Sequence, residues 1–364
     1  MGPTPFAGMT LADMGAEVVR VERPGGLGVF PGDPKQDILN RGKESVGLDL
    51  KSRDAIDAVL TMVERADILI EGGRPGVAER LGIGPDECQS RNPALVYGRM
   101  TGWGQDGPLA TTAGHDIGYI AVTGALHAIG AADGPPQIPL NLVGDFGGGS
   151  AYLVMGVLAA LLESKVTGRG RVVDAAIVDG TAHLLAGTHA LMNTGTWADA
   201  RGVNMLDGGA PYYGVYETLD SRHMAVGAIE PKFYALLLDG LGVTTVDRRD
   251  QNDRKTWAAT RSVFASAFRE RTQREWTAVF EGTDACVSPV VSMTEAPDHP
   301  HIRHRGSVVE ENGLIQPSPA PRFSGIESAI TAVPPAAGQH TEDVLRRWGV
   351  DPVPLLASGV AFQG

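Results

Sequence analysis

Two titratable side chains set among glycines are the first candidates for chemistry in this 364-residue chain. His115 lies in the segment Ala113–Tyr119, and Asp145 lies in Gly144–Ser150, directly before a long apolar stretch. Because the glycines after Asp145 carry no side chains, a substrate can approach the backbone there closely. A histidine and a carboxylate placed in this way can transfer protons to and from a carbon next to a carbonyl group.

The apolar stretch predicts a helix that begins near Ser150. The first N–H groups of a helix lack partners within it, and its dipole places partial positive charge at the same end. N–H groups near Asp145 would then stabilise an oxyanion formed from the carbonyl group. A structural interpretation stays open, since glycine clusters form turns, an Asp before a helix serves as its N-cap, and a lone His packs against apolar residues.

Composition sets the bounds of these predictions. A hydrophobic share of 43% with 20% charged residues is typical of a globular protein with two domains, or one large domain carrying an insertion. The net charge of −12 argues against nucleic acid or an anionic membrane surface as a partner. No apolar run reaches the roughly 18–20 residues of a membrane span, so the segment Ala151–Leu162 is expected to form a buried helix.

The cellular compartment follows from the cysteines and the N-terminus. Cys88 and Cys286 are isolated, without pairing or metal-ligand spacing, which fits a reducing compartment. The first residues lack the basic and apolar regions of a signal peptide. We therefore expect a cytoplasmic protein. Cys286 has apolar neighbours and is expected to be a packed thiol.

The first half of the chain alternates helix and strand patterns. The predicted elements are the helix Phe6–Gly15, the strand Glu17–Glu22, the loop Pro24–Gly42, the helix Arg53–Ala66 capped by Ser52, and the strands Asp67–Ile70, Leu95–Tyr97 and Arg171–Val178. This alternation predicts an α/β fold with a parallel sheet and crossover helices. No strand precedes the first helix, so we expect a missing first strand, for instance through a start codon assigned too late.

A smaller domain is predicted after Gly208–Pro211. Its expected elements are hairpin strands at Tyr212–Thr218 and His223–Ile229, followed by helices at Pro231–Leu241, Trp257–Phe268 and Gln273–Phe280. The predicted boundaries are residues 1–185 for the first part of the large domain, 186–210 for a linker, 211–297 for the small domain and 298–364 for a segment that returns to the large domain.

Cationic side chains gather near the ends of the predicted strands: Arg20, Arg23, Lys51, Arg74, Arg80 and Arg99. Open α/β sheets bind ligands at the carboxyl ends of their strands, and arginine forks suit phosphates. These residues predict an anionic, nucleotide-like ligand, with ordinary surface solubility as the alternative. No Walker loop or dinucleotide fingerprint is present. The histidines at 299, 301 and 304 lack the spacing of a zinc site.

Distinctive segments are spread along nearly the whole chain: Leu11–Pro24, Leu48–Lys51, Glu71–Gly76, Arg80–Gly82, Arg99–Gln105, the two segments around His115 and Asp145, and Gly227–Tyr234. Taken together they resemble the α-methylacyl-CoA racemases of the family III CoA-transferase superfamily. The resemblance implies a Rossmann-like large domain built from both ends of the chain and a small α+β domain inserted between them. It also implies an interlocked homodimer, with each active site between the large domain of one subunit and the small domain of the other.

The resemblance also implies roles for individual residues. His115 and Asp145 match the catalytic pair, and Glu230 matches a supporting carboxylate from the small domain. The positions that match CoA-binding residues are Arg23, Leu48, Asp49, Leu50, Lys51, Gly72, Gly73, Arg74, Arg80, Gly114, Asp116, Ile117, Gly118 and Tyr119. No metal or organic cofactor is expected, because CoA is part of the substrate.

The expected reaction is inversion of the α-carbon of a 2-methylacyl-CoA thioester by 1,1-proton transfer through an enolate. The alternative is CoA transfer, in which the Asp145 carboxylate attacks the acyl-CoA and forms an aspartyl-CoA intermediate. His115 separates the two, since a two-base racemase needs it and a transferase does not. A non-catalytic acyl-CoA-binding scaffold would leave the titratable pair unused.

Overall fold

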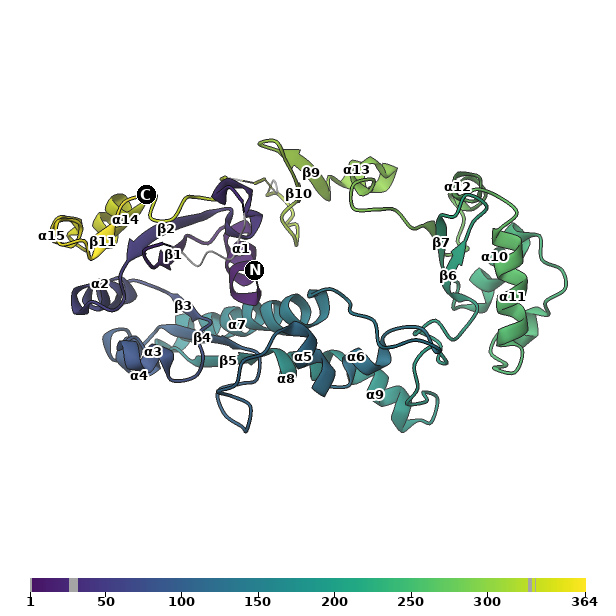
Figure 1. The fold of residues 1–364 in the computed structure, drawn as a ribbon, viewed down its shortest axis with the longest axis horizontal. Coiled ribbons are helices and arrows are strands. Elements are labelled where there is room, and N and C mark those ends of the chain that lie inside the picture. Colours follow the sequence, from purple (N-terminus) through teal and green to yellow (C-terminus); the bar gives the residue numbers. More distant parts are fainter. Residues whose placement is uncertain (1, 26–31, 327–328, 331) are drawn as a thin grey trace. The chain divides into compact units, whose positions relative to one another are not determined.

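The computed structural model describes residues 2–25, 32–326, 329–330 and 332–364, and their contacts form two compact units. Unit 1 comprises Met1–Thr123, Leu140–Leu184 and Pro297–Gly364, and unit 2 comprises Gly124–Pro139 and Leu185–Ala296 (Figure 1). Unit 1 therefore contains both ends of the chain. Residues 124–139, which the sequence analysis assigned to the large domain, group with unit 2, as do the residues of the expected linker.

Unit 1 contains parallel strands, as the alternating pattern predicts. Within the described residues they form two three-stranded sheets rather than one sheet. The first joins β1 (Val18–Glu22) in parallel to β2 (Lys43–Leu48), with β11 (Ala361–Phe362) antiparallel at the other edge of β2. The second consists of β3 (Ile68–Glu71), β4 (Val96–Thr101) and β5 (Val172–Ala176), all parallel.

One core of unit 1 lies between the first sheet and helix α2 (Arg53–Val63). The apolar face predicted for this helix is buried, with Ile56, Val59 and Val63 packed in the same cluster as Val46 of β2. Ser52 occupies the N-cap position, although its side chain makes no capping hydrogen bond. The remaining helices of this part are α1 (Pro3–Asp13), α3 (Val77–Leu81) and α4 (Pro85–Arg91).

The C-terminal segment completes this core. It contains α13 (Pro300–Arg305), the hairpin of β9 (Val308–Glu311) and β10 (Leu314–Pro317), and then α14 (Thr341–Arg347) and α15 (Pro352–Ala357). Val344 and Leu345 are fully buried in the cluster that holds α2. Burial of these side chains explains how residues far apart in sequence build one unit.

A second core of unit 1 lies under helix α7 (Tyr152–Thr167). Leu153 and Val157 are fully buried and pack in one cluster with Val96 of β4. Together with the helical turns before it, α7 forms a 26-residue segment, Leu142–Thr167, whose mean hydropathy of 1.5 makes it long and apolar enough to cross a membrane. The expectation that no segment reaches this length is therefore wrong, and α7 is buried on one side only, with Leu153 and Val157 in the core and Leu162 and Val166 exposed.

The start of this helical segment also differs from the prediction. A π-helical segment, η3 (Leu142–Ala151), precedes α7 without a break, so the helix begins at Leu142 and not near Ser150. Asp145 therefore lies inside the helical segment, and Asn141 takes the N-cap position. Single π-helical turns are frequent at functional sites.

Glycines bring η3 into backbone contact with α8 (Ile177–Leu184). A Cβ atom at position 180 would lie 1.9 Å from the carbonyl oxygen of Gly148. A Cβ atom at position 148 would lie 2.5 Å from the hydroxyl of Thr181. Because real Cβ atoms do not approach so closely, both positions require glycine, and the wide turn of η3 fits only against this bare surface.

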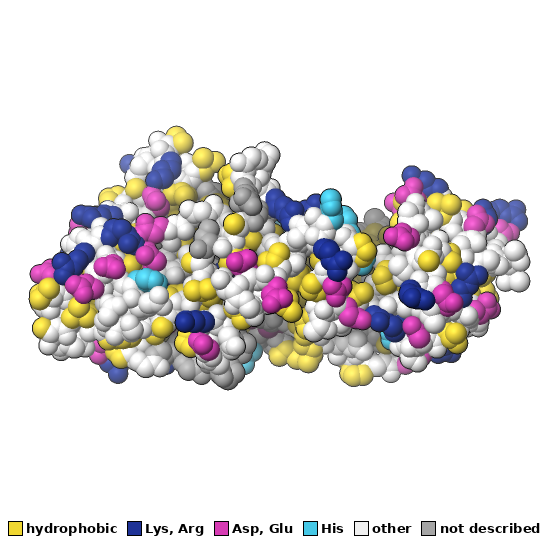
Figure 2. All heavy atoms as spheres, turned by 90° about the horizontal axis from the view of Figure 1, so that it is seen from above, with side chains coloured by type: hydrophobic (Ala, Val, Ile, Leu, Met, Phe, Trp, Pro, Cys, Tyr) yellow, Lys and Arg dark blue, Asp and Glu magenta, His cyan; other side chains and the backbone are white. Residues whose placement is uncertain are grey.

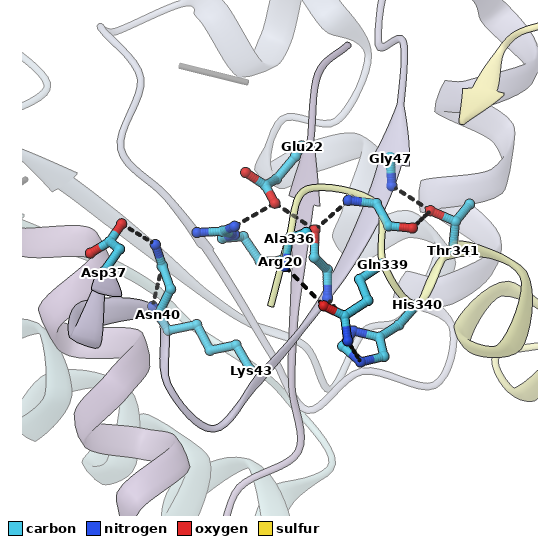
Figure 3. A network of polar contacts seen from close by, with 12 residues as sticks. Arg20, Glu22, Asp37, Asn40, Lys43, Gly47, Ala336, Gln339, His340 and Thr341 are labelled. Carbon is cyan, nitrogen blue, oxygen red and sulfur yellow. Dashed lines mark hydrogen bonds and ion pairs between the residues drawn. The ribbon is translucent and has the colours of Figure 1, made fainter. Parts of the chain in front are cut away.

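A cluster of polar side chains holds the first sheet to both ends of the chain, and we call Arg20, Glu22, Arg41, Lys43 and Ser45 the β1–β2 polar cluster. Figure 3 labels three of them, Arg20, Glu22 and Lys43. Glu22 accepts hydrogen bonds of 2.5 Å from Arg20 and from the hydroxyl of Ser45. The Ser45 hydroxyl in turn accepts the N–H of Gly338 at 2.8 Å. These bonds join β1 and β2 to the C-terminal segment.

The two cationic members of the cluster that are buried have partners on neighbouring elements. Lys43 donates to the carbonyl of Pro5 at 2.8 Å and to the side chain of Asn40 at 3.2 Å. Arg41 forms an ion pair with Asp13 at 2.6 Å and is only 1% exposed. Loss of one partner would leave a buried charge uncompensated, so these contacts fix the position of α1 against the sheet.

Unit 2 is an antiparallel three-stranded sheet covered on one face by helices. The sheet orders β6 (Tyr213–Glu217), β7 (His223–Gly227) and β8 (Val287–Pro289), and the helices that share its core are α10 (Pro231–Leu241), α11 (Trp257–Phe268) and α12 (Gln273–Phe280). Unit 2 also contains α6 (Ala125–Ala128) and α9 (Ala186–Asn193), which lie outside this core cluster. The predicted hairpin and the last three helices are confirmed. Their core is aromatic, with Tyr216 stacked on Phe268 at 5.1 Å between ring centroids.

Charged side chains are spread over the surface. Figure 2 shows acidic and basic side chains interspersed over one face of the molecule. Many form exposed ion pairs, such as Arg171 with Glu163 and Arg346 with Glu342. Exposed pairs of this kind contribute little to stability, so the net charge of −12 acts mainly on solubility and partner choice.

Candidate active site

His115 lies at the N-cap position of α5 (Asp116–Val122). Its extended backbone (φ −138°, ψ 167°) begins the helix, and its carbonyl accepts the N–H of Gly118 at 2.8 Å. The side chain is exposed, and within the described residues its ring has no hydrogen-bond partner. The backbone of His115 is therefore fixed by the helix start, while both ring nitrogens are available to a substrate.

Asp145 is held by three neighbouring segments. Its carboxylate accepts a hydrogen bond from the side-chain amide of Asn141 at 3.3 Å, and its carbonyl accepts the hydroxyl of Ser150 at 2.9 Å. Its backbone N–H donates to the carboxylate of Asp116 at 2.6 Å. The next side chain, Phe146, stacks on Phe6 of α1 with ring centroids 4.3 Å apart. These contacts fix the position of a carboxylate that remains only partly buried.

The surroundings of Asp145 raise the pKa of its carboxyl group. Burial is the largest cause, the hydrogen bond from Asn141 opposes it, the charge of Asp116 raises the pKa further, and the charge of His115 lowers it. The net shift is upward. His115 thus lies within electrostatic range of Asp145, and a carboxylate with a raised pKa is a stronger base.

Two N–H groups near Asp145 are already engaged. The N–H of Asp145 donates to Asp116, and the N–H of Phe146 donates to the carbonyl of Asn141 at 3.2 Å. They cannot be the oxyanion donors that the sequence predicted at this point. Because η3 begins at Leu142, the N–H of Phe146 already bonds within the helical segment, and the first-turn N–H of Asp145 is taken by the carboxylate of Asp116.

Aromatic rings form the wall behind His115. Tyr119 is 9% exposed and meets Trp103 edge to face, with ring centroids 4.7 Å apart. A Cβ atom at position 114 would lie 2.5 Å from the Tyr119 ring, so Gly114 is required for this packing. Burial raises the pKa of the Tyr119 hydroxyl, the charge of Asp145 raises it further, and the charge of Arg74 lowers it. Arg74 therefore lies near the catalytic candidates.

The expected CoA-binding residues at strand ends fall into two groups. Arg23, Lys51, Arg74 and Arg80 are exposed cations in the segments after β1, β2 and β3. The glycines 72 and 73 follow β3 directly, and the Asp49 side chain accepts the N–H of Lys51 after β2. On α5, the side chain of Ile117 is 43% exposed, and Gly118 faces open space.

The leucines of this set differ from the cations. Leu48 is fully buried, and Leu50 packs against the same core. Only their backbone atoms can face a ligand.

Two of the predicted phosphate-binding cations are structural. Arg99 is buried and donates to Glu71 at 3.0 Å and to Glu79 at 2.7 Å. Arg20 is bound to Glu22 within the β1–β2 polar cluster. Because their guanidinium groups are committed to carboxylates, neither is offered to an anionic ligand.

Glu230 belongs to unit 2, whereas His115 and Asp145 belong to unit 1. It is exposed at the N-cap position of α10, and its charge contributes, after burial, to a raised pKa of the Cys286 thiol. Its contact with His115 stays a prediction.

Cys286 is exposed with a left-handed backbone (φ 54°), so the expectation of a packed thiol is wrong. Apolar neighbours in sequence do not set the direction of a side chain in a turn.

Two further points concern metal ions and the residues around Asp145 that the sequence analysis did not assign to the site. Among the described residues no group of three His, Cys, Asp or Glu side chains could hold a metal ion. The sequence analysis missed Asn141 and grouped Asp116 with the CoA-binding positions, although its carboxylate binds Asp145. The Asp116–Asp145 contact joins residues 29 positions apart, so no local pattern could have predicted it.

Comparison with known proteins shows the family to which this chain belongs. The family model described as CoA-transferase family III matches residues 1–341, and the chain belongs to this family. Among curated relatives, the α-methylacyl-CoA racemase of Mus musculus is 43% identical over 98% of this chain and 92% of its own length. The α-methylacyl-CoA racemase of Homo sapiens is 42% identical, covering 96% and 90%.

Solved structures agree with the fold. A crystal structure of Rv3272 from Mycobacterium tuberculosis has a TM-score of 0.76 and 28% identity, covering 93% of this chain and 94% of that one. A CAIB/BAIF family protein from Brucella suis has a TM-score of 0.79 at 23% identity, covering 95% and 96%, which shows the shared fold alone. The predicted α/β fold of the family III CoA-transferases is confirmed.

Proposed function

We propose that this protein is a racemase that inverts the α-carbon of 2-methylacyl-CoA thioesters. The observation that carries this proposal is the pair His115 and Asp145, two titratable groups of one unit within electrostatic range of each other. The exposed cations Arg23, Lys51 and Arg74 suit the phosphates of CoA. The similarity to two curated α-methylacyl-CoA racemases supports the same activity.

The reaction is a proton transfer at one carbon. One base removes the α-proton of the thioester and leaves a planar enolate. The second group, in its protonated form on the opposite face, then donates a proton to the α-carbon and inverts the centre. Each group must act as acid in one direction and as base in the other, which the exposed His115 ring and the Asp145 carboxylate can both do. No metal or organic cofactor enters these steps.

CoA transfer is the second candidate, favoured by the accessible carboxylate of Asp145. In that reaction the carboxylate attacks the thioester carbonyl, the CoA thiolate leaves, and an acyl-aspartyl anhydride forms. The thiolate then attacks the aspartyl carbonyl, which releases the acyl group as a carboxylate and leaves aspartyl-CoA for transfer to the acceptor. The succinyl-CoA:glutarate CoA-transferase of Mus musculus is 28% identical to this chain, covering 99% of this chain and 87% of its own length. His115 weighs against this candidate, because covalent transfer through Asp145 requires no second base.

One experiment separates the two candidates. The enzyme is incubated in D₂O with one epimer of a 2-methylacyl-CoA, with and without an acceptor carboxylic acid. Racemisation predicts deuterium at the α-carbon and both epimers in the product, without any acceptor. Formation of the acceptor's CoA ester with no deuterium at the α-carbon would instead establish the transferase.

We further propose that the enzyme is an interlocked homodimer located in the cytoplasm. The dimer is supported by an apolar stripe along η3 and α7, with Leu142 at 56%, Met155 at 55%, Leu162 at 71% and Val166 at 82% exposure. The cytoplasmic location rests on the two unpaired cysteines, Cys88 and Cys286. A stripe of this kind is suited to burial against a second copy of the chain. Leu162→Glu should give a monomer by light scattering, and Glu230→Gln should lower activity while the dimer is retained.

A further inference from the structure

The carboxylate of Asp116 occupies an unusual place between the two proposed bases. Asp116 follows His115 directly in the chain, and its side chain is 9% exposed. One oxygen, Oδ2, accepts the backbone N–H of Asp145 at 2.6 Å. The other oxygen, Oδ1, is buried, and within the described residues it has no hydrogen-bond partner. Burial of a carboxylate oxygen without a hydrogen bond costs free energy, so its presence here calls for an explanation.

The glycine before Asp145 makes room for this contact. A Cβ atom at position 144 would lie 2.3 Å from Oδ2 of Asp116 and 3.0 Å from Ile120 of the same helix. Gly144 is itself buried. The backbone of η3 therefore lies directly against the start of α5, and the hydrogen bond is the polar connection between them.

We infer that Asp116 is a positioning residue that fixes the separation of His115 and Asp145, an inference that rests on the proposed racemase function. The backbone of His115 is fixed by the start of α5, and the backbone of Asp145 is fixed to the next residue of that same helix start. Movement of one backbone relative to the other thus requires the Asp116–Asp145 bond to break. A reaction in which two bases face one carbon needs such a fixed separation.

The charge of Asp116 adds a second effect. It is one of the causes that raise the pKa of the Asp145 carboxyl group, after burial. A like charge nearby disfavours ionisation of Asp145 and makes its carboxylate a stronger base. The same side chain therefore affects both the place and the basicity of Asp145, and these two effects can be separated by substitution.

The test compares Asp116→Asn with Asp116→Ala. Asparagine keeps an oxygen for the Asp145 N–H and removes the charge, whereas alanine removes both. Exchange of the α-proton from each epimer of a 2-methylacyl-CoA is measured across pH. For Asp116→Asn, the acid limb of the pH profile should move to lower pH for the epimer that Asp145 deprotonates, with a smaller change for the other. For Asp116→Ala, kcat should fall roughly 10-fold or more for both epimers, because the Asp145 N–H loses its partner.

The Michaelis constant distinguishes positioning from binding. Asp116 was grouped with the CoA-binding positions, and a side chain that contacts CoA should raise KM when it is removed. A positioning role predicts a loss in kcat with KM for the thioester changed by no more than about twofold. Gly144→Ala acts on the same contact from the other side and should lower kcat in the same way, which keeps the test decisive if Asp116→Ala does not fold.

Asp86→Asn is the matched control, because Asp86 is an exposed carboxylate in the first turn of α4, also in unit 1. It should leave both pH profiles unchanged. Unshifted profiles for Asp116→Asn together with wild-type kcat for Asp116→Ala would overturn the inference, as would a rise in KM with kcat unchanged. Absence of α-proton exchange in the wild-type enzyme would be a different result, since it contradicts the proposed function itself.

Discussion

Two polar regions of unit 1 use their hydrogen-bonding groups in opposite ways. In the β1–β2 polar cluster, Glu22 accepts from two side chains and Lys43 donates to two oxygens on different elements. Around η3, within the described residues, the Asp145 carboxylate has a single hydrogen-bond partner, Asn141, and the His115 ring has none. The first region commits its polar groups to the fold, and the second leaves capacity for a substrate.

The difference also separates two kinds of pKa shift. Burial lowers the pKa of Lys43 to about 7, yet this amine is enclosed between α1 and the sheet. Burial raises the pKa of Asp145, and this carboxylate is partly exposed beside a second titratable group. A shifted pKa therefore indicates chemistry only where the group can be reached, and we expect substitutions in the two regions to affect different measurements.

The largest expected effect lies in the site. His115→Ala should reduce α-proton exchange from one epimer by roughly 10²–10⁴-fold and affect the other less, and Asp145→Asn should show the opposite bias. The reason is that each base faces one side of the enolate. The measurement is deuterium incorporation from each epimer at early times.

Asp145→Asn is preferred to alanine because it keeps the shape of the side chain against Asn141. An equal loss from both epimers in both variants would indicate that one of the two residues only orients the substrate. Circular dichroism of both variants should match that of the wild-type enzyme, since neither residue lies in a hydrophobic core cluster.

The next effect lies in the β1–β2 polar cluster and concerns stability. Arg41→Met should lower the free energy of unfolding by about 3–5 kcal/mol, because it leaves the buried carboxylate of Asp13 without its partner. Urea unfolding measures the change. The fraction that remains folded should racemise at the wild-type rate, and a selective loss of kcat would show that the cluster is not separate from the site.

A smaller effect comes from the titration of Lys43. Its pKa in the folded protein is about 7, against an ordinary value of 10.5, so between these values the unfolded chain binds more protons than the folded one. Stability should therefore rise as pH increases from about 7. From pH 7 to pH 9 the wild-type protein should gain about 1–2 kcal/mol relative to Lys43→Met. The control Lys255→Met, at an exposed position of unit 2, should show no such difference.

The smallest effect concerns the stability contributed by Asp145. Its pKa is raised in the folded protein, so the free energy of unfolding falls as pH rises from the ordinary range of a carboxyl group through the folded value. Asp145→Asn removes this cost and should raise Tm at pH 7 by about 1–2 °C. The gain should vanish in acid, where the wild-type carboxyl group is protonated, and a lower Tm at both pH values would contradict it.

Much of the fold could be predicted because it depends on local patterns. The period of Ile56, Val59 and Val63 indicates a helix with one buried face, and α2 has that face. The hairpin and the helices of unit 2 follow from turn residues and from Pro231 at a helix start. Features that depend on long-range packing were predicted less well. Examples are the division of the strands of unit 1 into two sheets and the extent of the helix that contains Asp145.

The site was predictable in its residue types and not in its connections. His115 and Asp145 stand out as titratable residues among glycines, and the chain places them in one unit. The bond from the Asp145 N–H to Asp116 could not be predicted, because it depends on how η3 lies against α5. The same is true of Arg99, whose position after a strand suggests a phosphate ligand until the carboxylates of Glu71 and Glu79 are seen beside it.

The bare backbone contact between η3 and α8 bears on how this family can evolve. The glycines at 148 and 180 are required by space alone, since a methyl group at either position would overlap the opposite segment. Selection would preserve them in any descendant that keeps this helix crossing, whatever reaction it catalyses. Gly148 and Gly180 therefore report the helix crossing and not the reaction, and a genome search for new racemases would gain its discrimination from the histidine at position 115.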